Sequence, residues 1–317
     1  MNRHLLPAVT CLALLGGGAA HANGAWSEFP AGGVVFKQDK DISILREDLE
    51  IGLDEIRVRY VFSSFAAEAL ERTIGFPLAK VPLDDSPDNF DDRSRAPDGE
   101  DPRNYMAFEV SVDGAPAAPT LHEYAWLGEV NVTARLGELG VPVFARDPEA
   151  FEKLAQLPEA TVRALTEEKL AVADGGWLVP QWHYQAVYEW TQSFKPGWTE
   201  VEVSYKPLFG SDYGPEPYLE SGSKSAGYCY DNATRQMLAG LSSFPEPFTV
   251  GYVLKTAGNW NGPIGTFNLR IKAGEGFARF CVPEGLRAVG DGESWVAEDF
   301  VPRSDLAIVF FGGAGDP

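Results

Sequence analysis

Few side chains in this sequence could carry out catalytic chemistry. Four histidines are present, and two of them, His4 and His21, precede residue 23, where we expect the mature chain to begin. A general base of the usual kind would therefore be His122 or His183. Each lies beside aromatic residues in a predicted strand, which favours a structural or surface role. The sequence contains no H-E-x-x-H, G-x-S-x-G or Walker-type glycine motif, so we assign no catalytic residue.

One short motif resembles a known catalytic pattern. Ser221 and Lys224 fit the S-x-x-K signature of penicillin-binding enzymes, and residues 255–258 partly match K-T-G. However, Ser221 lies in a loop rich in Gly and Ser, and no S-D-N separates the two motifs. Their separation is also too short for that fold. We interpret the match as a coincidence.

Hard oxygen ligands gather in the acidic segment 82–103. Five aspartates there could bind Ca²⁺, namely Asp84, Asp85, Asp88, Asp91 and Asp92. The segment lacks the D-x-[DN]-x-[DN]-G pattern, and its prolines and arginines are typical of a solvated loop. Calcium is therefore the weaker alternative, and we expect chelators to have little effect. No other metal and no cofactor is indicated.

Cysteine usage points to an oxidising compartment. Cys11 lies in the predicted signal, which leaves Cys229 and Cys281 in the mature chain. An even pair in an exported protein predicts a disulfide. The alternative is a zinc site shared with the two histidines, but neither Cys belongs to a C-x-x-C motif or lies near a His. Closing a loop of about fifty residues would stabilise the fold by roughly 3–4.7 kcal/mol.

Aromatic residues are concentrated between positions 177 and 198. Exposed Trp faces can stack on sugars or hold the anchor residues of a partner protein. Tyr184, Tyr188 and Trp190 share one parity with Trp182, which favours a buried strand face. The candidate ligand contacts are Trp198, Trp177 and Trp260, and we expect Trp198, which follows a Pro-Gly turn, to be the most exposed.

The elements that must position these residues are mostly strands. Ile56, Val58 and Tyr60 alternate with Arg57 and Arg59, which predicts a strand with one buried side. The same period of two recurs along the chain, in residues 108–112, 184–190, 201–205, 250–254 and 267–271, and a buried closing strand is expected at 306–311. Asp113-Gly114 predicts a hairpin turn.

One segment breaks this pattern, at about 131–174. Asp147-Pro148-Glu149 combines a helix cap, a proline at the first position and an acid in the first turn. Pro158 starts a second predicted helix, and 133–140 holds a third short turn. We therefore predict an all-β fold with two β-sandwich-like units, the first of which carries a short α-helical insertion. The expected boundaries are 1–22 signal peptide, 23–207 first unit, 208–228 linker, and 229–317 second β domain with the disulfide.

The first 22 residues have the order of a secretion signal. Arg3 precedes an apolar stretch at 5–15, and Ala20-His21-Ala22 matches an A-x-A cleavage site. The stretch is too short to span a bilayer, which needs about 20 helical residues. Lipidation of Cys11 is the disfavoured alternative. We predict a periplasmic or secreted protein without a membrane span. The net charge of −20 disfavours binding to nucleic acid or anionic lipid.

Several motifs carry a family resemblance. They are Gly32-Gly33-Val34-Val35-Phe36, Gly75-Phe76-Pro77-Leu78, the Tyr188–Phe194 strand and Asn259-Trp260-Asn261-Gly262-Pro263-Ile264-Gly265. Over residues 31–311 the chain resembles a bacterial exported family known as domain of unknown function 4424. The resemblance implies no activity and no site residues. A weaker likeness, through Phe76-Pro77-Leu78 and Val112-Asp113-Gly114, is to the VIT domains of inter-α-trypsin inhibitor heavy chains, where function does not transfer with fold.

The leading hypothesis is a non-catalytic binding or cell-envelope structural module. Its partner would be an unidentified protein or glycan of the envelope. The alternative is a secreted hydrolase that acts on glycan with two carboxylates, because glycosidases need only a pair of acids. Two buried carboxyl groups about 5–9.5 Å apart in an aromatic cleft would favour the hydrolase. A solid sandwich core without a cleft would favour the binding module.

Overall fold

Strands dominate the computed structural model, so the all-β prediction is confirmed. The structure describes residues 25–28, 35–83, 103–144, 148–208, 210–211, 216–219, 226–290 and 292–312. Most strands belong to three sheets of eight, seven and four strands. None of the helices in these ranges is long and apolar enough to cross a membrane.

The eight-stranded sheet contains strands from both halves of the sequence. In spatial order it holds β19 (Arg287–Val289), β20 (Ser294–Phe300), β17 (Ile264–Lys272), β3 (Ile42–Gly52), β4 (Ile56–Ser64), β14 (Gly197–Tyr205), β7 (Glu109–Val112) and β8 (Ala115–Pro116). Strands β3 and β17 pair in parallel, whereas the other neighbours are antiparallel. This pair joins the sequence before 208–228 to the sequence after it. The division of the chain at 208–228 stays a prediction.

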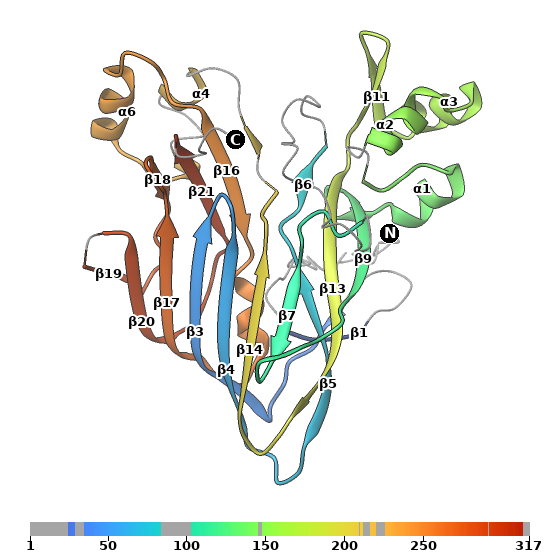
Figure 1. The fold of residues 1–317 in the computed structure, drawn as a ribbon. Helices are drawn as coiled ribbons and strands as arrows, with labels where there is room; N and C mark the ends of the chain where they lie inside the picture. The colour runs from blue at the N-terminus through green and yellow to red at the C-terminus, as the bar shows by residue number, and fades with distance from the viewer. Residues whose placement is uncertain are drawn as a thin grey trace, which may run out of the picture.

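The seven-stranded sheet packs against one face of the eight-stranded sheet. It holds β10 (Val130–Asn131), β9 (Thr120–Leu127), β13 (His183–Phe194), β5 (Leu70–Pro77), β1 (Ala25–Glu28) and β2 (Val35–Phe36), with β6 (Val81–Pro82) beside β13. In Figure 1 the two sheets converge at the lower end of the view, where β4 turns into β5 and β13 turns into β14. We call this the closed end.

The core lies between these two sheets, as the alternation in β4 predicts. Ile56, Val58, Tyr60 and Phe62 are at most 4% exposed and face inward. At the closed end the ring of Phe62 lies 5.3 Å from that of Phe194 in β13. Burial of such side chains contributes about 1.5–3 kcal/mol each, so this interface holds the sandwich together.

The four-stranded sheet packs on the same inner face of the eight-stranded sheet. It contains β15 (Gly210–Ser211), β16 (Pro247–Tyr252), β21 (Leu306–Phe311) and β18 (Phe277–Phe280). The hydroxyls of Tyr252 in β16 and Tyr60 in β4 are 3.4 Å apart, and Phe280 meets Trp295 of β20 edge to face. Buried residues around Phe311 form a second, smaller core under the helices α4 (Glu216–Leu219) and α6 (Asn232–Ala239).

The disulfide prediction is confirmed. Cys229 and Cys281 are bonded, with a sequence separation of 52 residues. The bond ties the residues before α6 to the end of β18 in the four-stranded sheet. It therefore fixes the helical cover of that sheet to one of its edge strands.

Helices occupy the predicted insertion. They are α1 (Thr133–Leu139), α2 (Pro148–Ala155) and α3 (Glu159–Glu167), followed by the hairpin of β11 (Ala171–Asp174) and β12 (Trp177–Pro180). Leu165 of α3 is fully buried and Leu170 is 3% exposed. A short 3₁₀ helix, η2 (Lys255–Asn259), precedes β17.

Candidate ligand-binding groove

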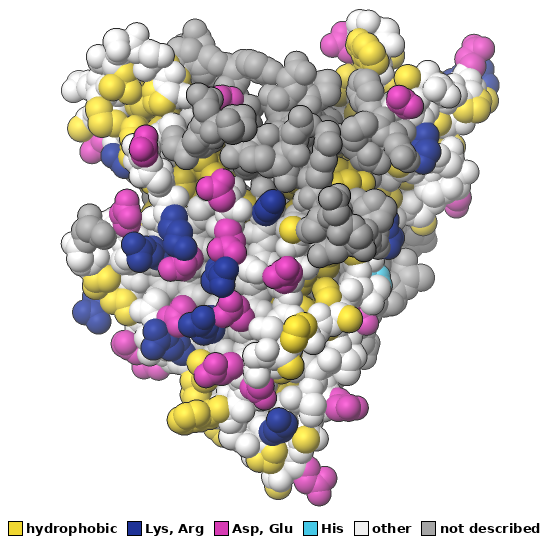
Figure 2. Space-filling view, in the orientation of Figure 1, with side chains coloured by type: hydrophobic (Ala, Val, Ile, Leu, Met, Phe, Trp, Pro, Cys, Tyr) yellow, Lys and Arg dark blue, Asp and Glu magenta, His cyan; other side chains and the backbone are white. Residues whose placement is uncertain are grey.

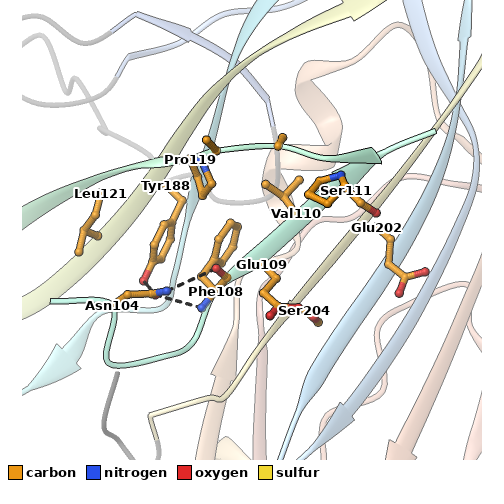
Figure 3. A pocket seen from close by; sticks show the side chains of 13 residues that line it. Asn104, Phe108, Glu109, Val110, Ser111, Pro119, Leu121, Tyr188, Glu202 and Ser204 are labelled. Atoms are coloured by element: carbon orange, nitrogen blue, oxygen red, sulfur yellow. Dashed lines mark hydrogen bonds between the residues drawn. The ribbon is translucent and has the colours of Figure 1, made fainter. Parts of the chain in front are cut away.

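A groove of about 550 Å³ follows the β7–β8 edge of the eight-stranded sheet (Figure 3). Its volume lies within the range of about 300–1,000 Å³ that is usual for ligand sites. One wall is polar and comes from β7 and β14. The other wall is apolar and is formed by the segment that crosses to the seven-stranded sheet.

The apolar wall follows from the predicted hairpin. Asp113 and Gly114 both have positive φ angles, of 49° and 78°, as a tight two-residue turn requires. The Asp113 carboxylate accepts a hydrogen bond of 3.0 Å from the Glu200 backbone N–H, which fixes the turn to β14. Pro116, which cannot donate to a further strand, ends the sheet edge. The chain then crosses to β9 through residues 117–119 and places Leu121 in the groove.

The floor of the groove is a stacked aromatic pair. The rings of Phe108 and Tyr188 are 3.9 Å apart and nearly parallel. The Tyr188 hydroxyl donates a hydrogen bond of 2.7 Å to Asn104 Oδ1, which also accepts one from the Phe108 backbone N–H. These bonds hold a turn in which Ala107 adopts a left-handed φ of 44°. Phe108 and Tyr188 are only 4% and 2% exposed, so they offer no open ring face for a sugar.

The polar wall consists of side chains that point away from the core. Val110 and Val203 alternate inward, so the side chains at positions 109, 111, 202 and 204 point outward. Ser204 pairs with Glu109 and Glu202 with Ser111 across the two strands. In Figure 3 Glu109 and Ser204 accordingly lie side by side.

Glu202 is held by two arginines of the neighbouring strand. Its carboxylate lies 2.8 Å from Arg57 Nη1 and 2.7 Å from Arg59 Nη2. The hydrogen bond from Arg59 lowers the pKa of Glu202 below its ordinary value, and Arg57 adds to this effect. Glu202 is therefore a carboxylate near neutral pH. Figure 2 shows that charged side chains of both signs cover this outer face of the sheet.

Glu109 differs from Glu202 in its surroundings. Its side chain is exposed, and it forms no hydrogen bond or ion pair with any residue in the described ranges. The hydroxyls of Ser111 and Ser204 likewise have no protein partner there. The groove is thus lined by one carboxylate without an ion-pair partner and two hydroxyls, together with apolar residues.

The tryptophans singled out from the sequence lie elsewhere. Trp198 is 75% exposed at the closed end, and Trp177 is 56% exposed in the β11–β12 hairpin. Trp260 is 2% exposed, because its ring packs against Phe62 at 4.8 Å and Phe194 at 5.8 Å. The selection of Trp260 as a ligand contact is therefore corrected to a core position. None of the three lines the groove.

The other chemically interesting residues also lie away from the groove. His122 Nε2 is 2.7 Å from Glu189 Oε2 on the outer face of the seven-stranded sheet, and His183 is the first residue of β13. The five aspartates considered for calcium, together with Ser221 and Lys224, lie outside the described residues. Within the described ranges, no three side chains of His, Cys, Asp or Glu gather as metal ligands.

Sequence reasoning missed the residues of the groove. Glu109, Ser111 and Ser204 read as ordinary outward positions of strands, because a period of two does not show which strands are neighbours. The available signal was the Pro-Ala-Ala-Pro run at 116–119 directly after the Asp-Gly turn. Two prolines three residues apart are incompatible with a continuing strand, and they mark the crossing between sheets.

Comparison with known proteins identifies relatives by sequence family only. Residues 22–309 match the family described as Domain of unknown function (DUF4424). No curated protein matches the sequence. A crystal structure of a candidate nutrient binding protein from Legionella pneumophila is 15% identical and has a TM-score of 0.41, covering 92% of this chain and 72% of that one. Similarity at this level supports no conclusion about fold or ligand. The likeness to VIT domains stays a prediction.

Proposed function

The chain belongs to the DUF4424 family, and we propose that it is an exported, non-catalytic binding module whose ligand occupies the groove along β7 and β8. The observation that carries the proposal is the pairing of an apolar wall with polar groups that have no partner in the described part of the protein. Such groups stay hydrated in the free protein and gain partners when a ligand binds. A mostly apolar site with a few placed polar groups is the usual composition of a ligand site.

The charges in the groove favour binding over hydrolysis. A glycosidase needs one carboxylic acid that remains protonated near neutral pH, which requires a raised pKa. The pKa of Glu202 is lowered instead, because Arg59 and Arg57 stabilise its charged form. Glu109 is exposed rather than buried, and the aromatic floor is covered. The pair therefore does not match the two buried carboxyl groups in an aromatic cleft that a hydrolase would use.

Export is the second part of the proposal. It is supported by the Cys229–Cys281 disulfide, which persists in oxidising compartments, and by the signal-like order of residues 1–22. Both observations support a periplasmic or secreted location.

The proposal is tested by blocking the groove. Ala118 is exposed on the apolar wall, so Ala118→Trp should fill the groove without disturbing the core. Ala115 is an equally exposed alanine of the same hairpin outside the groove, and Ala115→Trp is the matched control. Native mass spectrometry of protein isolated from its own cell envelope should show a bound species in the wild type and in Ala115→Trp, but not in Ala118→Trp.

Two results would contradict the proposal. One is the same bound species in all three proteins, since it would place the ligand elsewhere. The other is turnover of a glycan or ester substrate that is lost in Glu109→Gln or Glu202→Gln, because it would assign the groove to a hydrolase.

A further inference from the structure

The groove shows an asymmetry of charge that bears on the class of its ligand. Glu202 and Glu109 occupy adjacent strands of the same wall. Arg57 and Arg59 neutralise the first carboxylate. Among the described residues, no Lys, Arg or His lies within ion-pair distance of the Glu109 carboxylate. The wall therefore carries one uncompensated negative charge, at Glu109.

The surroundings of Glu109 suit an elongated cationic group. Ser204 lies directly opposite Glu109 in the pairing of β14 with β7, and its hydroxyl can accept a hydrogen bond from an N–H donor. Pro119 and Leu121 also line the groove and offer aliphatic surface. A lysine side chain matches this arrangement, because its stem packs on apolar surface while its ammonium group reaches a carboxylate.

We propose that the groove binds a peptide segment that bears a lysine or arginine side chain, with the cation paired to Glu109 and the neighbouring apolar side chains of the segment on Pro119 and Leu121. This inference rests on the proposed function of the groove. A glycan is disfavoured because Phe108 and Tyr188 are buried against each other and leave no stacking face. The net charge of −20 also attracts cationic segments and repels anionic ones.

The test uses a matched pair of labelled peptides, Ac-Ala-Leu-Lys-Ala-Leu-NH₂ and the same peptide with norleucine in place of lysine. Norleucine keeps the aliphatic stem and removes the ammonium group. Fluorescence anisotropy should show that the lysine peptide binds wild-type protein about two- to fivefold more tightly than the norleucine peptide, as expected for one exposed ion pair. This difference should shrink in 0.5 M salt.

Protein variants locate the effect. Glu109→Gln should weaken binding of the lysine peptide to the level of the norleucine peptide and leave the norleucine peptide unaffected. Glu200→Gln removes an exposed acid from the same sheet face outside the groove and should change neither affinity. n-Butylamine, which has the ammonium group without a peptide, should fail to displace the labelled peptide at equal concentration.

The possible results distinguish the claim that the ligand is a cationic peptide from the claim that the groove is the binding site. Equal affinity for the two peptides, no effect of Glu109→Gln, or equal competition by n-butylamine would overturn the assignment to a cationic peptide. So would the absence of measurable binding at millimolar peptide. The proposed function would still stand if another ligand is lost in Ala118→Trp, and it would fail together with the inference if no ligand responds to that variant.

Discussion

The closed end of the sandwich and the groove use similar residue types in opposite ways. At the closed end Asp39, 2% exposed, accepts hydrogen bonds from the backbone N–H groups of Asp41 and Ile42 and a 2.6 Å bond from Arg72 Nε. Both oxygens of its carboxylate are therefore occupied. In the groove the carboxylate of Glu109 and the hydroxyls of Ser111 and Ser204 have no such partners among the described residues.

This difference indicates that Asp39 contributes to the stability of the fold, whereas Glu109 is available to bind a ligand. A buried carboxylate without partners would cost several kcal/mol, so Asp39 must be fully satisfied by the protein. An exposed carboxylate is satisfied by water and can exchange that water for a ligand. Changes at the closed end should therefore alter the free energy of unfolding, whereas changes at the groove should alter binding.

The largest expected effect comes from breaking the closed end. Asp39→Ala removes the carboxylate that accepts from Arg72 Nε and from two backbone N–H groups. Arg72, whose side chain is 14% exposed, keeps a longer 3.5 Å contact to the exposed Asp41 carboxylate. We expect the free energy of unfolding to fall by about 3–5 kcal/mol, measured by urea denaturation. Asp39→Asn retains one acceptor oxygen and should lose less. A loss below about 1 kcal/mol for Asp39→Ala would mean that this contact does not close the sandwich.

The disulfide provides a second perturbation that is remote from the groove. Replacing Cys229 and Cys281 together by alanine opens a loop with a sequence separation of 52 residues. The expected loss in the free energy of unfolding is about 2–4 kcal/mol. Peptide affinity of the folded protein should stay unchanged in anisotropy titrations. An affinity that falls in parallel with stability would show that the two regions are coupled.

A hydrogen bond beneath the groove should have a smaller effect on stability than the contacts of Asp39. Tyr188→Phe keeps the stacked ring and removes the hydroxyl that donates to Asn104. We expect a loss of about 0.5–1.5 kcal/mol in thermal or urea unfolding. Tyr205→Phe is the matched control, because the hydroxyl of Tyr205 has no hydrogen-bond partner among the described residues. Equal losses in both variants would contradict the role assigned to the Tyr188–Asn104 bond.

The smallest expected effect is the pH dependence of the Glu202 pairs. The pKa of Glu202 is lower in the folded protein than the ordinary value of about 4.3 because Arg59 and Arg57 stabilise its charge. The unfolded chain therefore binds more protons in this range. The contribution, at most about 1 kcal/mol, is present above about pH 4.3 and is lost as the pH falls through the folded pKa.

Comparing the unfolding of wild type and Glu202→Gln against pH measures that contribution. Their difference should shrink as the pH is lowered below about 4.3. A difference that grows on acidification would mean that folding raises the pKa of Glu202 instead of lowering it.

The sequence predicted local features well because they depend on neighbouring residues. The buried alternation in β4, the Asp113-Gly114 hairpin and the helix that begins at Pro148 all agree with the structure. The disulfide followed from the compartment and the even count of cysteines. Each of these inferences requires only short-range patterns or composition.

The groove and the burial of Trp260 depend on distant pairings. Glu202 meets Ser111 only because β14 lies beside β7, and alternation alone does not reveal that neighbour. Trp260 follows η2 in a segment that reads as a loop, and its burial arises from contacts with Phe62 and Phe194, which lie far away in the sequence. For the same reason tryptophans are selected from the sequence as ligand contacts, and Glu109, Ser111 and Ser204 are missed. The position of these three residues in the groove depends on which strands are neighbours.

The most direct test of the groove as the binding site is site-specific photocrosslinking in the native host. A small aliphatic amino acid that carries a diazirine, and that is too small to fill the groove as tryptophan does, is placed either at Ala118, on the apolar wall, or at Ala115, in the same hairpin outside the groove. The proposed binding site predicts a discrete crosslinked species from position 118 that is absent from position 115. Equal crosslinking from both positions, or crosslinking from position 115 alone, would contradict it.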